Sequence, residues 1–265
     1  MSLLSDMSPR RALPGDAVDA GTMATAVRAG QHSADELALA ARERYLAVNS
    51  DINAIVEWYG EPDRLDEAAD GPLAGVPILA KDYGSAVEGR LVEMGSRMAT
   101  GNRAAKTATF MKRLLRAGAQ IVGRSAAPEF IQHGTTESRR YGATRNPHHL
   151  DFSAGGSSGG AAAAVAAGIV PAAHASDCAG SIRIPAATTG LIGLKPGGDK
   201  IPWQNTSAAS DWGGIASEFV VARTVDDAAL FLEVLGDGDY LPAKQRYVVG
   251  ISTCLLYTSP SPRDS

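Results

Sequence analysis

Two serine-containing turns, each flanked by glycines, constrain the fold of this chain more than any other feature. The first turn, 155–160, contains Ser157, and the second, which follows a short apolar segment, contains Ser181. Between them, the sequence predicts an alanine-rich helix over 159–167 and a strand near 170–175. A helix followed by a returning strand can bring the second turn back beside the first. Glycines around each serine let the backbone approach a substrate closely and turn N–H groups inward.

The remainder of the chain alternates between helical and extended patterns. Helices are expected at 17–29, after a Ser33–Glu36 capping box, and at 107–117, 159–167 and 225–235. Strands are expected at 53–58, 75–82, 120–124, 170–175 and 247–252. Residues 125–155, rich in Gly, Asn, Pro and His, are expected to be irregular. Such alternation predicts an α/β domain with a largely parallel sheet. In the capped helix, apolar residues that include Leu39 and Leu46 are expected to pack on the core.

Composition and charge exclude several classes of function. The chain is 45% hydrophobic and 20% charged, with a formal net charge of −4, so no electrostatic footprint for nucleic acid is present. Two cysteines, Cys178 and Cys254, cannot build a disulfide framework and fit a reducing compartment. The N-terminus lacks a signal-like apolar core, and no run of about 18 apolar residues occurs. We expect a cytoplasmic protein with no nucleic-acid or membrane partner.

The two ends of the sequence depart from the globular pattern. Residues 1–16 have few apolar groups and two prolines, so we expect a flexible lead-in before a single domain portion at 17–253. Residues 254–265 break the strand pattern that begins at 247, and no helix follows to cover a parallel strand. We expect this tail to be non-native or disordered.

The two serine turns provide hydroxyls and backbone N–H groups suited to stabilising an oxyanion, but a serine nucleophile needs a base. The histidines lie in no recognisable catalytic motif, and the chain has no G-x-S-x-G nucleophile elbow. We therefore interpret all five as structural or surface residues: His32, His133, His148, His149 and His174. Lys81 ends an apolar strand, where burial would lower its pKa. From the residues alone, a lysine at a strand end is a solvated charge more often than a base.

Taken together, these segments resemble the amidase signature family over roughly 20–250. The family's motifs occur in order, as Gly-Val-Pro before Lys81-Asp82, Gly-Ser-Arg at 95–97, Arg-Ala-Gly-Ala at 116–119, Pro-Glu-Phe at 128–130, Thr-Thr-Glu-Ser at 135–138, Thr-Arg-Asn-Pro at 144–147, Gly-Gly-Ser-Ser-Gly-Gly at 155–160, Asp-Cys-Ala-Gly-Ser-Ile-Arg-Ile-Pro-Ala at 177–186 and Gly-Leu-Ile-Gly-Leu-Lys-Pro at 190–196. The resemblance implies an α/β fold whose central twisted, mixed β-sheet is covered by helices on both faces and is incomplete at the C-terminus here.

The same resemblance implies an amidohydrolase that cleaves a carboxylic amide to acid and amine, or ammonia, through an acyl-enzyme. Carried over by motif, Ser181 is the nucleophile, Ser157 is a relay in a cis-peptide geometry, and Lys81 is the base. The implied oxyanion hole is the backbone N–H groups of Cys178, Ala179, Gly180 and Ser181. The expected partner is a small-molecule amide, with no metal or organic cofactor, and a homodimer is left open.

Several neighbours of these residues receive supporting roles. Family members commonly have glycine where Ala179 stands. If this position required a positive φ, the alanine would strain the chain by about 1 kcal/mol. We interpret Cys178 as packing and Ser158 as a helix cap. Asp177 and Arg183 are expected to form an ion pair that holds the nucleophile turn. Glu129 and Thr136 are expected to order the loop beside it.

Three other interpretations remain. A glycine-rich loop that opens a helix can bind phosphate, but the chain has no G-x-x-x-x-G-K-[ST] motif, and the second turn would go unexplained. An amidase subunit of a tRNA-dependent amidotransferase also fits the resemblance, although the motifs are closer to stand-alone amidases, including those acting on cyclic or linear amide oligomers. The third interpretation is an inactive, poorly soluble product. The family domain is longer than this chain, and a sheet that ends early would expose an unpaired edge strand.

Overall fold

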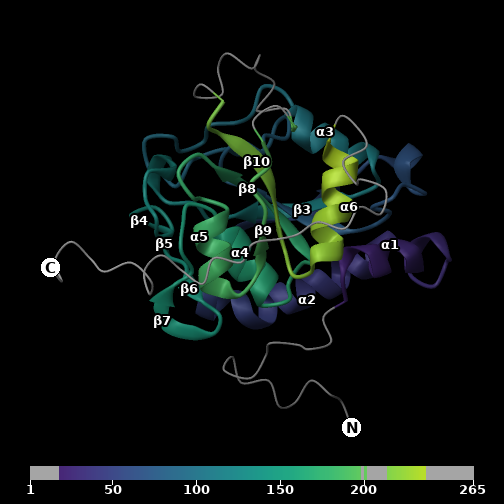
Figure 1. Ribbon diagram of the computed structural model, residues 1–265, viewed down its shortest axis with the longest axis horizontal. Coiled ribbons are helices and arrows are strands. Elements are labelled where there is room, and N and C mark those ends of the chain that lie inside the picture. The colour runs from purple at the N-terminus through teal and green to yellow at the C-terminus, as the bar shows by residue number, and fades with distance from the viewer. Residues whose placement is uncertain (1–17, 198–199, 202–213, 237–265) are drawn as a thin grey trace, which may run out of the picture.

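The computed structural model describes residues 18–197, 200–201 and 214–236. The expected lead-in at 1–16, strand at 247–252 and tail at 254–265 lie outside these residues. Within them, a six-stranded mixed sheet is flanked by helices (Figure 1). Its strands, in chain order, are β1 (Ile55–Asp63), β2 (Pro77–Lys81), β3 (Gln120–Ser125), β8 (Ala172–Asp177), β9 (Ile192–Gly193) and β10 (Ser217–Ala222).

The sheet has the spatial order β1-β3-β2-β8-β10-β9. Strands β3, β2 and β8 are parallel to one another, whereas β1, β10 and β9 each join antiparallel to a neighbour. The alternation of the sequence alone predicted a largely parallel sheet, and this holds only for the central three strands. The mixed sheet implied by the family resemblance is the one observed.

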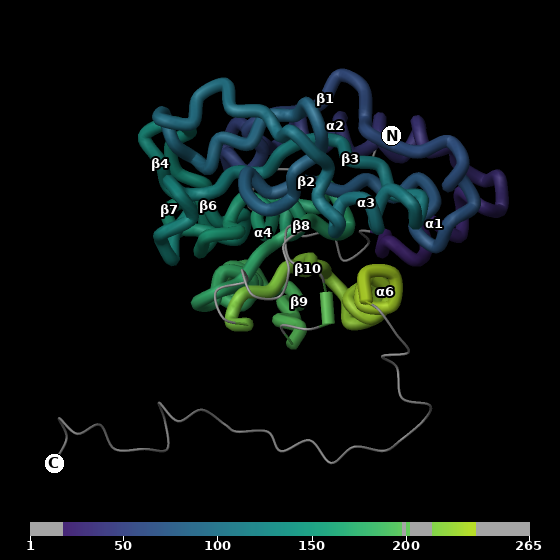
Figure 2. The backbone as a smooth tube through the Cα atoms, turned by 90° about the horizontal axis from the view of Figure 1, so that it is seen from above, coloured from purple at the N-terminus to yellow at the C-terminus, as the bar shows by residue number. Residues whose placement is uncertain are grey.

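The helices cover the sheet and bury its central strands on both faces. They are α1 (Ala20–Arg28), α2 (Ala34–Ile52), α3 (Thr109–Arg116), α4 (Gly159–Ala166), α5 (Arg183–Thr189) and α6 (Val225–Leu235). Helices α3 and α6 pack against each other, and α4 contacts strands from β1 to β10 (Figures 1 and 2). Every residue of β2, β3, β8 and β10 is buried, as expected for strands with cover on both faces. No helix among the described residues is both long and apolar enough to span a membrane.

Helix α2 begins at the predicted capping box, but only part of the apolar set expected on its core face packs there. Ser33 Oγ accepts from Glu36 N at 3.1 Å, and Glu36 Oε2 accepts from Ser33 N at 2.7 Å. Its buried residues are Ala41, Val48 and Ile52, whereas Leu39 and Leu46 are exposed. The prediction for these two leucines was therefore wrong, because the packed stripe follows the i, i+7, i+11 spacing set by Ala41.

The segment between the two serine turns forms as predicted, with one shift. Helix α4 is wholly buried, and β8 begins two residues later than the predicted start at Val170. A Cβ on Gly160 would lie 2.4 Å from Ala126 N, so glycine at this position lets α4 approach the end of β3. Helix α5 and strands β9 and β10 were not predicted from the sequence.

The stretch 125–155 is less irregular than expected. It contains two short antiparallel pairs, the first formed by β4 (Glu137–Ser138) with β5 (Gly142–Ala143) and the second by β6 (Arg145–Asn146) with β7 (His149–Ser153). Two 3-10 turns, η2 (Asp66–Ala68) and η3 (Glu129–Ile131), complete the described elements.

Candidate active site

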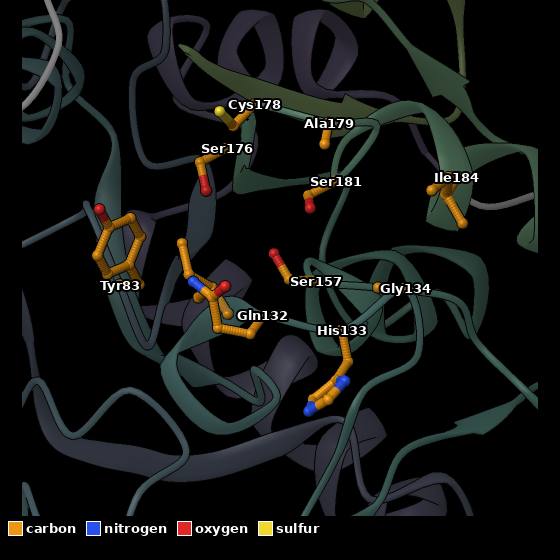
Figure 3. A pocket seen from close by; sticks show the side chains of 12 residues that line it. Tyr83, Gln132, His133, Gly134, Ser157, Ser176, Cys178, Ala179, Ser181 and Ile184 are labelled. Atoms are coloured by element: carbon orange, nitrogen blue, oxygen red, sulfur yellow. The ribbon is translucent and has the colours of Figure 1, made fainter. Parts of the chain in front are cut away.

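A pocket of about 200 Å³ opens where the two serine turns meet. Ser157 of the first turn lies on the same side of it as residues 132–134, and the end of β8 and the second turn lie across from them (Figure 3). The lining residues are Tyr83, Ile131, Gln132, His133, Gly134, Gly156, Ser157, Ser176, Cys178, Ala179, Ser181 and Ile184. The side chains of Ser157 and Ser181 both point into the space between the turns (Figure 3). The structure therefore brings together the two serines that the sequence singled out.

Lys81 lies behind Ser157 in what we call the hydroxyl cage, which consists of Ser157, Ser158 and Ser176. Its Nζ lies 2.8 Å from Ser157 Oγ, 2.8 Å from Ser158 Oγ and 2.9 Å from Ser176 Oγ. Only 1% of Lys81 is exposed, because it ends the central strand β2. Burial lowers the pKa of Lys81 to about 7, although Glu218 and Asp177 oppose the shift. Near neutral pH this amine can therefore exist uncharged and accept a proton.

Ser158 does not cap helix α4, contrary to the prediction. It occupies the N-cap position with φ −98° and ψ 33°, and its side chain makes no capping hydrogen bond. Its hydroxyl instead accepts from Lys81 and lies 3.4 Å from the Ser176 carbonyl oxygen. A tertiary partner has replaced the local one, and no sequence pattern pointed to Ser176 as the third member of the cage.

The peptide bond between Gly156 and Ser157 is cis, as the family resemblance implies. The turn that carries it is held by Thr136, whose hydroxyl donates to Gly155 O at 2.9 Å and accepts from Gly159 N at 3.0 Å. Nearby, Ser96 Oγ donates to Glu129 Oε1 at 2.8 Å. Thr136 therefore holds the first serine turn, whereas Glu129 is bound to Ser96.

The second serine turn, which carries Ser181, is organised around the buried carboxylate of Asp177. Arg183 donates to it twice, from Nε at 2.9 Å and from Nη2 at 3.0 Å, which confirms the predicted ion pair. The backbone N–H groups of Gly180 and Ile182 donate to the same carboxylate at 2.7 and 3.2 Å. Burial opposes the charge, but these partners more than offset it, so the pKa of Asp177 lies below its usual value. One of the four predicted oxyanion donors, the Gly180 N–H, therefore donates to Asp177 and does not point into the pocket.

Ala179 is tolerated in this turn because it does not adopt a positive φ, whereas Gly180 does, at +115°. A Cβ at residue 180 would also lie 2.8 Å from Ile184 Cδ1. The glycine requirement therefore falls on residue 180, and the alanine before it carries no left-handed strain. Cys178 was interpreted from the sequence as packing, but it is half-buried and lines the pocket.

A second buried polar cluster, which sequence reasoning missed, adjoins the site at Asp82. We call it the Arg124 cluster. Arg124 is bound to Asp82 at 2.6 Å, to Glu57 at 3.0 Å and to Glu93 at 3.0 Å. The Asp82 carboxylate also accepts from the N–H groups of Glu93 and Gly95. The charged run around Lys81-Asp82 was the available signal, but it could not identify the partners.

Two of the histidines lie near the site, one in the wall of the pocket and one in the buried sheet. His133 lines the exposed wall of the pocket, and His174 is fully buried in β8 with its ring edge-on to Phe110. Burial and the nearby Lys81 hold the pKa of His174 well below its usual value. None of the five contacts a serine hydroxyl of the pocket through a hydrogen bond in the described part of the chain.

Comparison with known proteins gives one consistent family. The family model described as amidase matches residues 36–253. A 6-aminohexanoate-cyclic-dimer hydrolase of Paenarthrobacter ureafaciens is 41% identical over 244 residues, which are 88% of this chain and 50% of that protein. An acylamidase of Rhodococcus erythropolis is 41% identical over 232 residues, which are 84% of this chain and 48% of that protein.

Solved structures agree with this assignment. A 6-aminohexanoate cyclic dimer hydrolase complexed with substrate superposes with a TM-score of 0.76 at 37% identity, covering 86% of this chain and 49% of that one. A bacterial aryl acylamidase of the amidase signature family gives a TM-score of 0.76 at 34% identity, covering 84% of this chain and 48% of that one. The chain thus spans about half the length of the relatives it matches.

Proposed function

The chain belongs to the amidase family, and from this premise we propose that it hydrolyses a small-molecule carboxylic amide to an acid and an amine through an acyl-enzyme. The observation that carries the proposal is the 2.8 Å contact between the buried Lys81 Nζ and Ser157 Oγ at the floor of a pocket that Ser181 faces (Figure 3). This is a hydroxyl coupled to a base whose pKa lies near neutrality.

In the proposed acylation, Ser181 Oγ attacks the amide carbonyl carbon. Its proton passes to Ser157 Oγ while the Ser157 proton passes to Lys81 Nζ, so that the charge formed on the base is a buried lysinium. The new C–O bond leaves a negative oxygen, for which we propose the N–H groups of Cys178, Ala179 and Ser181 as donors. Gly180 N–H is left out because it donates to Asp177.

The tetrahedral intermediate then collapses with cleavage of the C–N bond. The proton held by Lys81 returns through Ser157 to the departing nitrogen, which leaves as a neutral amine. Water then attacks the acyl-enzyme and loses its proton through Ser157 to Lys81. As the acyl C–O bond breaks and the acid leaves, this proton returns through Ser157 to Ser181 Oγ, which regenerates the enzyme. Hydrolysis by this sequence corresponds to amidases that act on carbon–nitrogen bonds other than peptide bonds.

The nucleophile is tested by labelling with a fluorophosphonate, which reacts with activated serines. We expect one adduct, on the peptide that contains Ser181, and none in Ser181→Ala. The matched control is Ser50→Ala, which removes an exposed serine hydroxyl from α2 and should label like the wild type. Labelling that survives in Ser181→Ala, or an adduct mapped to another residue, would overturn the assignment.

The substrate class is tested separately. The names of two relatives point to a 6-aminohexanoate cyclic dimer and an acyl amide as the first compounds to try. Release of the amine, followed by chromatography, should depend on Ser181 in the same way as labelling. The amidotransferase alternative is not favoured, since subunits of that type match at 38% identity or less.

A further inference from the structure

Two titratable side chains that the proposed mechanism does not use lie buried near the hydroxyl cage. They are His174 on β8 and Glu218 on β10, both fully buried. His174 Nε2 lies 3.8 Å from Glu218 Oε1. A buried carboxylate is costly to keep ionised unless a positive or hydrogen-bonding group accompanies it, so its position in the sheet requires an explanation.

The strand register places Glu218 close to Lys81. In the antiparallel pairing of β10 with β8, Glu218 lies opposite Ser176, and Val220 lies opposite His174. Directly paired residues carry their side chains on the same face, with Cβ atoms about 4.5–5.5 Å apart, and residues two apart share a face. Glu218, Ser176 and His174 therefore share one face of the sheet. Because Ser176 Oγ lies 2.9 Å from Lys81 Nζ, Glu218 is one side chain away from the amine.

The other charged groups near this face are already neutralised or uncharged. Asp177, the acid at the end of β8, is bound to Arg183. His174 is kept neutral by burial and by Lys81, which hold its pKa well below its usual value. The remaining buried cation of the described residues, Arg124, is bound to three carboxylates. Of the buried cations described, Lys81 is therefore the one whose charge Glu218 can balance.

We propose that Glu218 and His174 form a positioning pair for Lys81, in which Glu218 supplies the counter-charge for the lysinium and the neutral His174 packs beside the carboxylate. The catalytic meaning of this pair rests on the proposed role of Lys81 as the base. When Lys81 receives a proton during acylation, the buried positive charge forms beside a fixed negative one. Glu218 and Asp177 both oppose the effect of burial on the pKa of Lys81, which fits this assignment.

The direct test is an NMR titration of the lysine side chains in protein labelled with ¹³C at lysine Cε. Lys81→Met identifies the Lys81 resonance by its loss. We expect the Lys81 midpoint to fall by about one pH unit in Glu218→Gln, since removal of a nearby opposite charge disfavours the charged amine. Asp227→Asn is the matched control, because Asp227 is also a buried acid but sits at the start of α6, and it should leave the midpoint unchanged.

An unchanged Lys81 midpoint in Glu218→Gln would overturn the proposal. If that variant does not fold, Glu218→Asp retains the charge but withdraws it by one methylene, and it should move the midpoint downward by a smaller amount. No shift in Glu218→Asp would contradict the proposal equally.

Fluorophosphonate labelling of the same proteins separates this inference from the proposed function. A wild type that labels at Ser181, with a Lys81 midpoint that Glu218 does not influence, would remove the positioning pair and leave the nucleophile in place. A wild type that does not label would remove the proposed function, while the NMR titration would still decide whether Glu218 balances Lys81.

Discussion

Lys81 and Asp82 are neighbours in the chain, yet they belong to two different kinds of buried polar cluster. Lys81 enters the hydroxyl cage, where its partners are three neutral serine side chains at 2.8 to 2.9 Å. Asp82 enters the Arg124 cluster, where a buried guanidinium meets three carboxylates. Both clusters satisfy their polar groups, but only the second neutralises its charges by direct ion pairing.

The difference teaches what each cluster can do. In the Arg124 cluster, although burial opposes it, pairing with Asp82 and Tyr141 raises the pKa of Arg124, so its charge is fixed at any physiological pH. In the hydroxyl cage, burial dominates and lowers the pKa of Lys81 to about 7. The first arrangement holds strand ends and loops together. The second leaves a proton that can be exchanged, as a base requires.

The largest expected effect comes from emptying the cage. Lys81→Met should lower the rate of Ser181 labelling by about 10³- to 10⁴-fold, because the relay loses its proton acceptor. Its free energy of unfolding should stay equal to the wild type or rise. Since the pKa of Lys81 is lowered in the folded state, the cost of burying the charge is fully present below about pH 7 and disappears as the pH rises towards 10.5. Urea denaturation at pH 6 measures the gain, and a marked loss of stability there would contradict this reading.

The complementary change breaks the paired cluster. Arg124→Met leaves the buried carboxylate of Asp82 without its cation and leaves Glu93 with Arg140 alone, which should cost about 3–5 kcal/mol of unfolding free energy. Urea denaturation is again the measurement, and Arg116→Met, exposed at the end of α3, is the control that should change stability by less than about 0.5 kcal/mol. Equal stability of the two variants would show that the paired cluster does not hold the fold.

A smaller effect on the labelling rate distinguishes the two roles of Ser158, namely the observed hydrogen bond with Lys81 and the helix cap that the sequence predicted. Ser158→Ala should slow Ser181 labelling about tenfold, through loss of one hydrogen bond to the lysine, and Ser176→Ala should do the same. A helix cap would behave differently, because its loss would lower stability by about 1 kcal/mol and leave the labelling rate unchanged. That second pattern in Ser158→Ala would restore the capping interpretation.

The sequence could predict the elements with strong local signals. The capping box of α2, the end of β2 at Lys81 and the bounds of α6 follow from periodicity and capping residues, and the structure has them. Strand β10 was missed because Glu218 and Ser217 interrupt its apolar run, and their burial depends on partners in β8 and on Lys195 and Pro196. A pattern of polarity cannot anticipate such partners.

The site shows the same division. The family motifs located Ser157, Ser181 and Lys81, and the structure places both serines at one pocket with Lys81 bound to Ser157 behind it. Ser158 was misinterpreted, since a serine before Gly-Gly-Ala satisfies the local rule for an N-cap while its true partner is 77 residues away in the sequence. His174 and Glu218 offered one usable signal, namely ionisable residues inside otherwise apolar strands.

The most direct test of the account is the pH dependence of Ser181 labelling in the wild type. Lys81 must be uncharged to accept a proton, and its pKa is about 7. The labelling rate should therefore be constant above about pH 8 and fall about tenfold for each pH unit below 7. A rate that rises steadily up to pH 10, as for a lysine with an ordinary pKa, or one that is independent of pH, would contradict the claim that the hydroxyl cage holds a neutral base.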